Sequence, residues 1–584
     1  MAVQTGDRRD AEPPTAATAA VPPRRFGIGS AALLGVVAVA VTFAIAELLA
    51  AFGQWTGWLD TASSPIAALG SAFIDLTPEW LKEWAIRTFG QNDKTALRIG
   101  MLLTVAIAAA VIGVVGRWRP RLGVGLAGVL LVVAAVAVVS RANGSVIDLV
   151  PLLIGAGVGL WVLVAGLRFG LGVRGAVASA DPAPPAPVGP PAPVGPPAPV
   201  APLDDTDPAG KVVLAGADHP MAAASAGGYD RRAFFRVAGL GALVAVAAGA
   251  LSRWIPSAAD VEASREAVQA QLPTVVNVQK TPAGTLDNVP GISPFVSPNS
   301  TFYRVDTAFT FPGLTAENWK LKIHGACDNP FEISYADLVK RPMIERMITL
   351  TCVSNEVGGD LAGNATWQGI RIADLLAEAK PRAEADCVLS TSAQDGFTVT
   401  TPLSALTDGR DALLAVKMNG EALPVEHGFP VRMVVPGLYG YVSATKWVVD
   451  MEITDFAQTT SFWSERGWAP RAPIKTASRI DTPRSFAQLA PGKVAVAGVA
   501  WAQHRGIKAV QVQVDEGEWA EATLSSPVSD DTWRQWVWEW DAPAGQHTLS
   551  VRAIDGKGEL QTGTRQDVMP DGATGWHSRV VTVG

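Results

Sequence analysis

A single cysteine at the end of an apolar run is the residue of this chain with the clearest potential for chemistry. Cys352 follows the β-type run 348–351 and precedes two small polar residues, 354–355. Only Cys327 and Cys387 accompany it in 584 residues, too few for a disulfide framework. A free cysteine is commonly a small buried hydrophobe. A thiol where a strand enters a loop is also placed to bind a ligand, because loops on rigid scaffolds carry functional sites.

The elements around this cysteine predict a mixed fold. Residues 270–460 alternate loops with short β-type runs, of which 319–323 and 431–435 are examples, and 372–378 has the pattern of a short amphipathic helix. This order of strands and helices predicts an α+β domain.

Four blocks of residues in this region resemble the sulfite oxidase-like molybdenum-pterin oxidoreductases. They are 298–304, 351–355 leading to 364–369, 427–432 leading to 435–437, and 443–447. Their order and spacing resemble that family across about 270–460. The resemblance implies a molybdopterin-binding oxidoreductase domain over 270–465, with molybdenum held by a single molybdopterin.

The resemblance also implies roles for individual side chains. Cys352 would be the metal ligand, since a soft thiolate suits a metal held by sulfur. Arg432 would bind the pterin phosphate through its planar fork, Lys446 would add a point charge, and Arg304 would orient an anionic substrate or contact the pterin. The other implied cofactor-binding residues are Asn299, Tyr303, Thr391 (or Ser392), His427, Ala444 and Thr445. Taken singly, His427 also fits a turn before a proline, and Arg432 and Lys446 fit surface charges.

The sequence departs from true sulfite oxidases beside the cysteine. Those enzymes carry arginines there that gather the sulfite anion, whereas residues 353–357 contain Glu356 and no arginine, and 305–306 is Val-Asp instead of Asn-His. A carboxylate facing the pocket would repel sulfite. We therefore expect oxygen-atom transfer to or from a small sulfur- or nitrogen-containing substrate, with a methionine sulfoxide or other sulfoxide reductase as the alternative. The alternative outside enzymes is a cofactor-free assembly scaffold.

Composition separates a membrane part from a soluble part. The chain is 48% hydrophobic and 17% charged, and its apolar excess lies mainly in the first 250 residues. A protein of this length is too long for one ordinary domain. The net charge of -7 argues against nucleic-acid binding, which needs a basic face.

Four apolar runs approach the roughly 20 residues that cross a bilayer, although buried core helices would give similar runs. They are 27–51, 97–116, 122–140 and 147–168, followed by a fifth, shorter run at 235–251. Arginines collect before the first run, between the second and third, after the fourth and before the fifth. Because basic loops stay in the cytoplasm, we expect a cytoplasmic tail (1–26), a four-helix anchor (27–169) in the plasma membrane, and an extracytoplasmic catalytic domain.

Two segments join the anchor to the outer domain. Residues 170–230 are rich in Pro and Ala, which predicts a semi-rigid cytoplasmic linker. Residues 231–252 begin with Arg231-Arg232 and resemble a twin-arginine export signal in mid-chain. The alternative is that these arginines are the ordinary basic flank of a fifth spanning helix. Both interpretations leave open whether segment 231–252 is cleaved.

Histidines and haem motifs bear on the electron partner. All six histidines lie at 219 or later, so the four leading spans have no axial ligands for a membrane haem. The sequence also contains no Cys-x-x-Cys-His motif. No haem is therefore expected, and electrons would pass to a separate redox protein or a quinone-linked carrier.

The C-terminal residues 485–584 change to short alternating strands separated by Pro and Gly, which predicts a β-sandwich. The region resembles the immunoglobulin-like dimerisation domain of the same family, and this resemblance implies a homodimer. Trp536, Trp538 and Trp540 share one strand face. We interpret them as core or interface residues.

Overall fold

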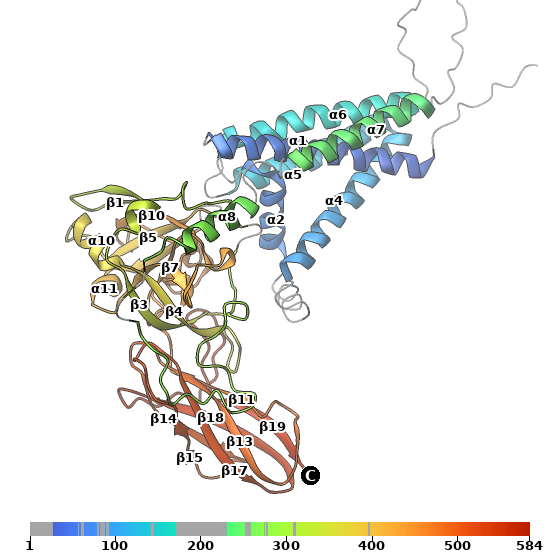
Figure 1. Ribbon diagram of the computed structural model, residues 1–584. Coiled ribbons are helices and arrows are strands. Elements are labelled where there is room, and N and C mark those ends of the chain that lie inside the picture. Colours follow the sequence, from blue (N-terminus) through green and yellow to red (C-terminus); the bar gives the residue numbers. More distant parts are fainter. Residues whose placement is uncertain are drawn as a thin grey trace, which may run out of the picture.

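The computed structural model describes a helical bundle at one end of the molecule and two β-rich parts at the other (Figure 1). The described residues are 27–170, 231–251 and 258–584, apart from short gaps at 57, 60–62, 79–80, 82–87, 89–92, 142–144, 274, 276–277, 308–310 and 395–396. The expected tail (1–26) and all but the first residue of the expected linker (170–230) lie outside the described residues.

The N-terminal part is a bundle of long apolar helices. Four helices of the described part are long and apolar enough to cross a membrane, with mean hydropathies between 2.2 and 2.8. They coincide with the four expected runs and are α1 (Ile28–Thr56), α4 (Asp93–Trp118), α5 (Pro120–Val139) and α6 (Val150–Gly170). The fifth run lies in α7 (Arg231–Leu251), which packs against α1 and α6 although its apolar part is shorter. A short helix, α2 (Pro65–Leu76), follows α1.

Glycines let α1 and α4 approach at backbone distance. A Cβ at Gly35 of α1 would overlap the carbonyl oxygen of Ala109, and a Cβ at Gly113 of α4 would overlap the carbonyl oxygen of Ala31. Small residues at helix crossings are typical of membrane bundles, where association depends on close packing. The start of α1 and the end of α4 therefore lie together.

A substitution at this crossing should destabilise the bundle. Gly113→Val is expected to cost about 1–3 kcal/mol, the range for overpacking a closely packed site. Gly100→Val is the matched control on the same helix, because a Cβ at Gly100 has no neighbour within 4 Å. Thermal unfolding of the detergent-purified chain measures both. Equal effects of the two substitutions would contradict the close crossing.

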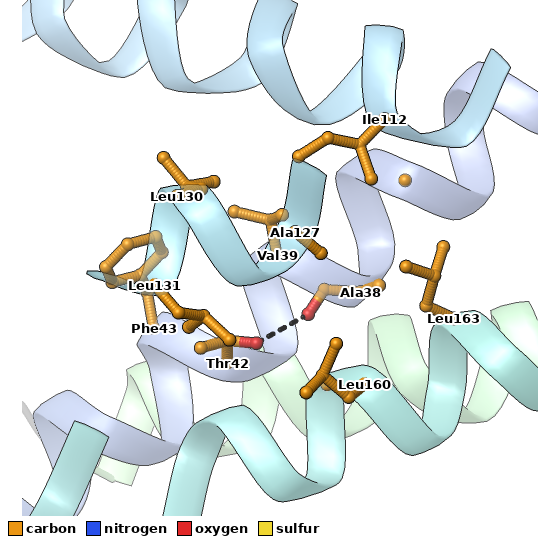
Figure 2. A pocket seen from close by; sticks show the side chains of 12 residues that line it. Ala38, Val39, Thr42, Phe43, Ile112, Ala127, Leu130, Leu131, Leu160 and Leu163 are labelled. Atoms are coloured by element: carbon orange, nitrogen blue, oxygen red, sulfur yellow. Dashed lines mark hydrogen bonds between the residues drawn. The ribbon is translucent and has the colours of Figure 1, made fainter. Parts of the chain in front are cut away.

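A small cavity lies where α1, α4, α5 and α6 meet (Figure 2). Its volume is about 20 Å³, room for one water, and its lining is almost wholly apolar. Thr42 contributes a polar side chain, but its hydroxyl already donates to the carbonyl oxygen of Ala38 at 3.0 Å. A water needs two to four polar partners, so a lining of this kind favours a dry cavity.

The end of the bundle at which α1 begins and α4 ends also holds the ends of other helices. A Cβ at Gly116, near the end of α4, would contact Leu167, near the end of α6. Figure 1 shows that α7 also begins at this end, and that the β-rich parts lie beyond its opposite end. After α7, the helix α8 (Ala258–Gln269) contacts the first β-rich part, where Arg265 donates to the carbonyl oxygens of Ala422 (3.2 Å) and Leu423 (3.0 Å).

The first β-rich part contains two five-stranded sheets around one core, which includes the fully buried Trp319 and Trp367. The first sheet has the order β2-β1-β10-β5-β6, with β1 Lys320–Gly325, β2 Phe331–Ser334, β5 Cys387–Ser392, β6 Thr398–Pro402 and β10 Val448–Thr454. The second has the order β3-β4-β7-β8, with β9 also on β7. Its strands are β3 Ile344–Thr351, β4 Ala362–Arg371, β7 Leu413–Met418, β8 Glu421–Ala422 and β9 Arg432–Val434.

Helices on this part are short: α9 Tyr335–Leu338, α10 Ile372–Ala379 and α11 Leu403–Thr407. The expected amphipathic helix is α10, which buries Ile372, Leu375, Leu376 and Ala379. The expected strands at 319–323 and 431–435 are β1 and β9.

The C-terminal part is a sandwich of two sheets around a second core. One sheet has the order β11-β13-β17-β16 and the other β12-β19-β18-β14-β15. Their strands are β11 Ala477–Thr482, β12 Gln488–Leu489, β13 Gly492–Trp501, β14 Ile507–Val514, β15 Ala520–Glu521, β16 Thr523–Leu524, β17 Arg534–Ala542, β18 Gly545–Asp555 and β19 His577–Val583. Because β11 pairs with β13, the sandwich begins before the expected residue 485. Trp536 and Trp540 are buried in its core, with Trp538 packed partly against it.

Candidate active site

The expected metal-ligand residue follows the outer strand of the second sheet. The backbone N–H of Cys352 donates to the carbonyl oxygen of Leu361 (2.9 Å), and its carbonyl accepts from the N–H of Asn355 (3.1 Å). These bonds close the loop between β3 and β4 at the cysteine. Burial raises the pKa of the Cys352 thiol, while hydrogen bonds with Ser354 and the positive charge of Lys446 oppose the rise. The raised pKa favours the protonated thiol, and a metal bound at this sulfur would displace the proton.

Tyr303, in the first family-like block, lies near enough to this cysteine for their charges to interact. Its ring stacks on that of Phe302, with centroids 5.1 Å apart. Burial raises the pKa of the Tyr303 hydroxyl, to which the charges of Cys352 and Arg432 also contribute in opposite directions. Tyr303 is thus an electrostatic neighbour of both the thiol and the guanidinium.

His427 presents one ring nitrogen to the site. Its Nε2 lies 3.1 Å from the carbonyl oxygen of Asn299, and since a carbonyl can only accept, Nε2 carries the hydrogen. Its Nδ1 is a buried acceptor that has no hydrogen-bond partner among the described residues. Burial, with the charges of Lys446, Arg432 and Arg304, lowers the pKa of His427 to about 3. The neutral ring can therefore accept a hydrogen bond from a ligand.

This lowered pKa predicts a pH dependence of stability. The pKa of an unfolded histidine is about 6.5, against about 3 for His427 in the fold. Above about pH 6.5 the free energy of unfolding is at its full value with respect to this histidine. As the pH falls below that, the free energy of unfolding decreases, because only the unfolded chain takes up the proton. The loss reaches about 2 kcal/mol at pH 5, at about 1.4 kcal/mol per pH unit. Thermal unfolding of the cofactor-free chain should show this fall, and His427→Gln should remove it. Parallel pH curves for the two proteins would contradict the assignment.

Arg432 is a buried cation with neutral partners. It is 4% exposed, and its fork donates to three backbone carbonyl oxygens, those of His427 (3.1 Å), Met433 (3.3 Å) and Ala444 (3.4 Å). Its guanidinium carbon lies 5.0 Å from the ring centroid of Trp367. Burial lowers its pKa to about 10. Within the part of the chain that the structure describes, no carboxylate pairs with it. A buried charge without a counter-charge favours binding of an anion.

Lys446 forms an ion pair with a carboxylate of the protein. Its Nζ lies 2.9 Å from Oδ2 of Asp306 and 2.9 Å from the carbonyl oxygen of Glu426. The Lys446 and Asp306 side chains are only 11% and 5% exposed. The sequence analysis assigned Lys446 as a point charge for the pterin phosphate and did not pair it with Asp306. Arg432 is consequently the stronger anion-binding group.

Thr391 is not brought together with the others. Oγ of Ser390 lies 2.7 Å from Oγ1 of Thr445, and Ser390 and Ser392 are buried on the same face of β5. Thr391 points to the opposite face because successive side chains of a strand alternate. Of the two alternatives, Ser392 therefore lies on the face that carries Ser390.

Arg304 occupies the edge of the site. Its guanidinium carbon lies 5.7 Å from the ring centroid of Phe311, and its charge is one of those that lower the pKa of His427. Its position is compatible with both expected roles, a substrate contact and a pterin contact.

Two site residues were missed by sequence reasoning. Asn419 donates from Nδ2 to Oδ1 of Asn299 (2.8 Å) and accepts from the N–H of Thr366 (2.9 Å), which orients the Asn299 side chain. In the sequence Asn419 is part of an Asn-Gly dipeptide, which is typical of a hairpin turn and does not indicate a site. Burial raises the pKa of Tyr439 to about 12, and the neighbouring Cys352 adds to the rise. No local pattern marks this tyrosine.

Comparison with known proteins gives a consistent picture. Residues 308–463 match the family model described as an oxidoreductase molybdopterin binding domain. Mitochondrial sulfite oxidase of Mus musculus is 30% identical over 318 residues, 46% of this chain and 58% of that protein. The uncharacterized oxidoreductase YuiH of Bacillus subtilis is 35% identical over 153 residues, 26% of this chain and 73% of that protein. The chain therefore spans little more than half the length of the mammalian relative.

A solved structure also aligns. Sulfane dehydrogenase SoxCD from Paracoccus pantotrophus aligns with 55% of this chain and 92% of its own, at 21% identity and a TM-score of 0.45.

The gathered residues fit a pterin-held metal. Cys352 offers a sulfur ligand, Nδ1 of His427 a buried acceptor, and Arg432 a buried positive charge. Across the described ranges, no group of three or more His, Cys, Asp or Glu side chains could hold a metal without help.

Proposed function

This chain belongs to the sulfite oxidase-like family of molybdopterin oxidoreductases, and on that premise we propose that it transfers an oxygen atom to or from a small substrate. The observation that carries the proposal is that the buried cation Arg432 donates from Nη1 to the carbonyl oxygen of His427 (3.1 Å), while Nδ1 of the same histidine is buried and has no hydrogen-bond partner among the described residues. A buried cation and a buried acceptor on neighbouring side chains suit a cofactor that has a phosphate and a hydrogen-bonding ring.

Each residue would have a distinct task. Cys352 would hold the molybdenum, and Arg432 would hold the pterin phosphate with help from Lys446. The Nδ1 lone pair of His427 would accept a hydrogen bond from the pterin, in a position fixed through Asn299. When bound, the molybdenum-pterin group supplies two-electron redox chemistry and the site of oxygen transfer. The protein supplies orientation and a buried setting.

The substrate is proposed as a neutral sulfur compound in preference to sulfite. Residues 353–357 carry Glu356 and no arginine, so this loop offers no positive charge to a small anion. The sulfoxide group of a compound such as methionine sulfoxide has a polar sulfur–oxygen bond but no net charge. We keep sulfite oxidation as the second candidate because of the similarity to sulfite oxidases.

We also propose that the catalytic part lies outside the cytoplasm. Arg117 lies in the last turn of α4, Arg119 directly precedes α5, Arg168 lies in the last turn of α6, and α7 begins at Arg231. Basic residues favour the cytoplasmic side, and the catalytic part follows the opposite end of α7. This supports a multi-pass plasma-membrane protein with a twin-arginine-like start to its fifth helix.

The remaining partners follow from the same proposal. Two electrons must leave or enter per turnover, and a separate redox protein or a quinone-linked carrier would exchange them. The sandwich would be an immunoglobulin-like domain through which two copies associate.

Elemental analysis of the purified full chain tests the proposal. The chain would be made in a host that supplies the cofactor and exports folded proteins, and then assayed with sulfite and with methionine sulfoxide. Molybdenum equimolar with the chain, and turnover of either compound, would support the proposal. Folded protein without molybdenum or tungsten, with the host's cofactor supply verified, would favour the cofactor-free scaffold.

A further inference from the structure

One buried amide, that of Gln503, is among the contacts by which the sandwich reaches β3, the strand before Cys352. β3 is the outer strand of its sheet and pairs only with β4. On its other edge, the backbone N–H of Thr349 donates to the carbonyl oxygen of Asp531 (2.9 Å), and the Thr349 carbonyl accepts from Nε2 of Gln503 (3.1 Å). These two residues of the sandwich part thus satisfy the backbone N–H and carbonyl groups of Thr349, as a neighbouring strand would.

The same amide also bonds the residue before the cysteine. Nε2 of Gln503 donates to Oγ1 of Thr351 at 3.0 Å, and Thr351 directly precedes Cys352. Gln503 is 0% exposed. Since a carbonyl can only accept, the bond to Thr349 requires that the NH₂ group faces the strand. Its Oε1 has no hydrogen-bond partner among the described residues, so the contribution of the side chain is that of a donor.

A second contact from the sandwich holds the loop after the cysteine. Nη1 of Arg479 in β11 donates to the carbonyl oxygen of Gly359 (2.7 Å), and its Nη2 donates to Oγ of Ser293 (2.8 Å). An ion pair with Asp481 (2.6 Å) fixes the guanidinium, and both side chains are 8% exposed. The backbone on each side of Cys352 is therefore held by the C-terminal part.

We propose that Gln503 is a positioning residue, which fixes the Cys352 sulfur by clamping the end of β3 from the sandwich. A ligand must be held within about 0.5 Å of its productive place, and partners behind a metal ligand typically matter 10–100-fold for metal affinity or activity. The consequence at the metal rests on the proposed function. The clamp itself acts on the polypeptide with or without the cofactor.

Alkylation of the cofactor-free full chain tests the clamp directly. Iodoacetamide labelling is followed peptide by peptide, with the buried Cys327 and Cys387 as internal references. Gln503→Met keeps a similar size but removes the donor, and Gln503→Leu removes all polarity. Both should raise the labelling rate of Cys352 about five- to tenfold, the change expected for one or two buried hydrogen bonds. An unchanged Cys352 rate, or an equal rise at all three cysteines, would overturn the proposal.

Gln535 gives a matched control within the same domain. It is also 0% exposed, and its Nε2 donates to Oδ1 of Asp287 (2.7 Å) and to the carbonyl oxygen of Ser293 (2.8 Å), away from β3. Gln535→Leu should lower stability without selective exposure of Cys352. Selective labelling of Cys352 in this variant would also overturn the proposal.

The loaded protein offers a second readout. The Mo(V) electron paramagnetic resonance signal of Gln503→Leu should differ from the parent signal, whereas that of Gln535→Leu should match it. Identical signals in the parent and Gln503→Leu would overturn a role at the metal. A parent chain without molybdenum would sink the proposed function, while the alkylation result would still decide the role of Gln503.

Discussion

Cys352→Ser is expected to abolish turnover, with a loss of at least about 10³-fold. That loss reaches or exceeds the 10²–10³-fold range for removing one transition-state hydrogen bond, because the substitution removes the proposed protein ligand of the metal. A hydroxyl is a harder ligand with a much higher pKa than a thiol and does not replace a soft thiolate. The measurement is steady-state turnover together with the molybdenum content of the purified chain.

The other cysteines provide the control. Cys327 and Cys387 are 3% and 0% exposed, and burial raises the pKa of Cys387 to about 12, which makes its thiol inert. Cys327→Ser and Cys387→Ser should keep molybdenum and turnover, although a buried hydroxyl costs some stability. Retained turnover in Cys352→Ser would remove this residue from the chemistry and with it the proposed site.

The helices of the anchor could be predicted because the bilayer imposes a simple rule on them. A spanning helix needs about 20 apolar residues and must satisfy its backbone internally. The runs 27–51 and 147–168 meet that rule from the sequence alone, and α1 and α6 coincide with them. The close crossing of Gly35 and Gly113 could not be predicted, since glycine is common in these helices and only their pairing reveals the contact.

The site was predictable only as separate blocks. Cys352, His427 and Arg432 each have a side-chain chemistry that suggests a ligand, and their blocks resemble one family. The pairing of Lys446 with Asp306 joins residues 140 positions apart, which no local pattern encodes. The choice between Thr391 and Ser392 was open for a different reason: a strand reverses its side chains at every residue, so two neighbouring residues lie on opposite faces.

The contacts between the sandwich and the first β-rich part could not be predicted from the sequence either. The alternating strands of the sandwich predicted two sheets, but not that Gln503 and Trp533 would complete the first β-rich part. The backbone N–H of Trp533 donates to Oγ1 of Thr349 (2.8 Å), and its ring lies in the core of that first part. Contacts of this kind depend on how two folded units pack together. In the sequence, the residues that make them have no local pattern that distinguishes them from other buried residues.

Arg432→Met should cost about 2–5 kcal/mol of cofactor affinity, the range for truncating one partner of a buried charged pair. Methionine fills a similar space and carries no charge, so the cofactor-free chain should stay folded, as buried charges are often replaceable by apolar side chains. Arg432→Lys keeps the charge but loses the planar fork, and should bind the cofactor with intermediate affinity. Pterin content and molybdenum per chain measure the effect. As a control, Arg341→Met removes an exposed pair with Glu378 and should change neither.

The outcome also decides between the two cations of the site. If Arg432→Met keeps the pterin, Lys446 must hold the phosphate, and its bond to Asp306 (2.9 Å) must then break or be shared. In that case Asp306→Asn would tighten cofactor binding, because it releases the full charge of the lysine. If Arg432 is the main phosphate partner, Asp306→Asn should change cofactor affinity by less than about 1 kcal/mol, close to the value of a single ordinary hydrogen bond.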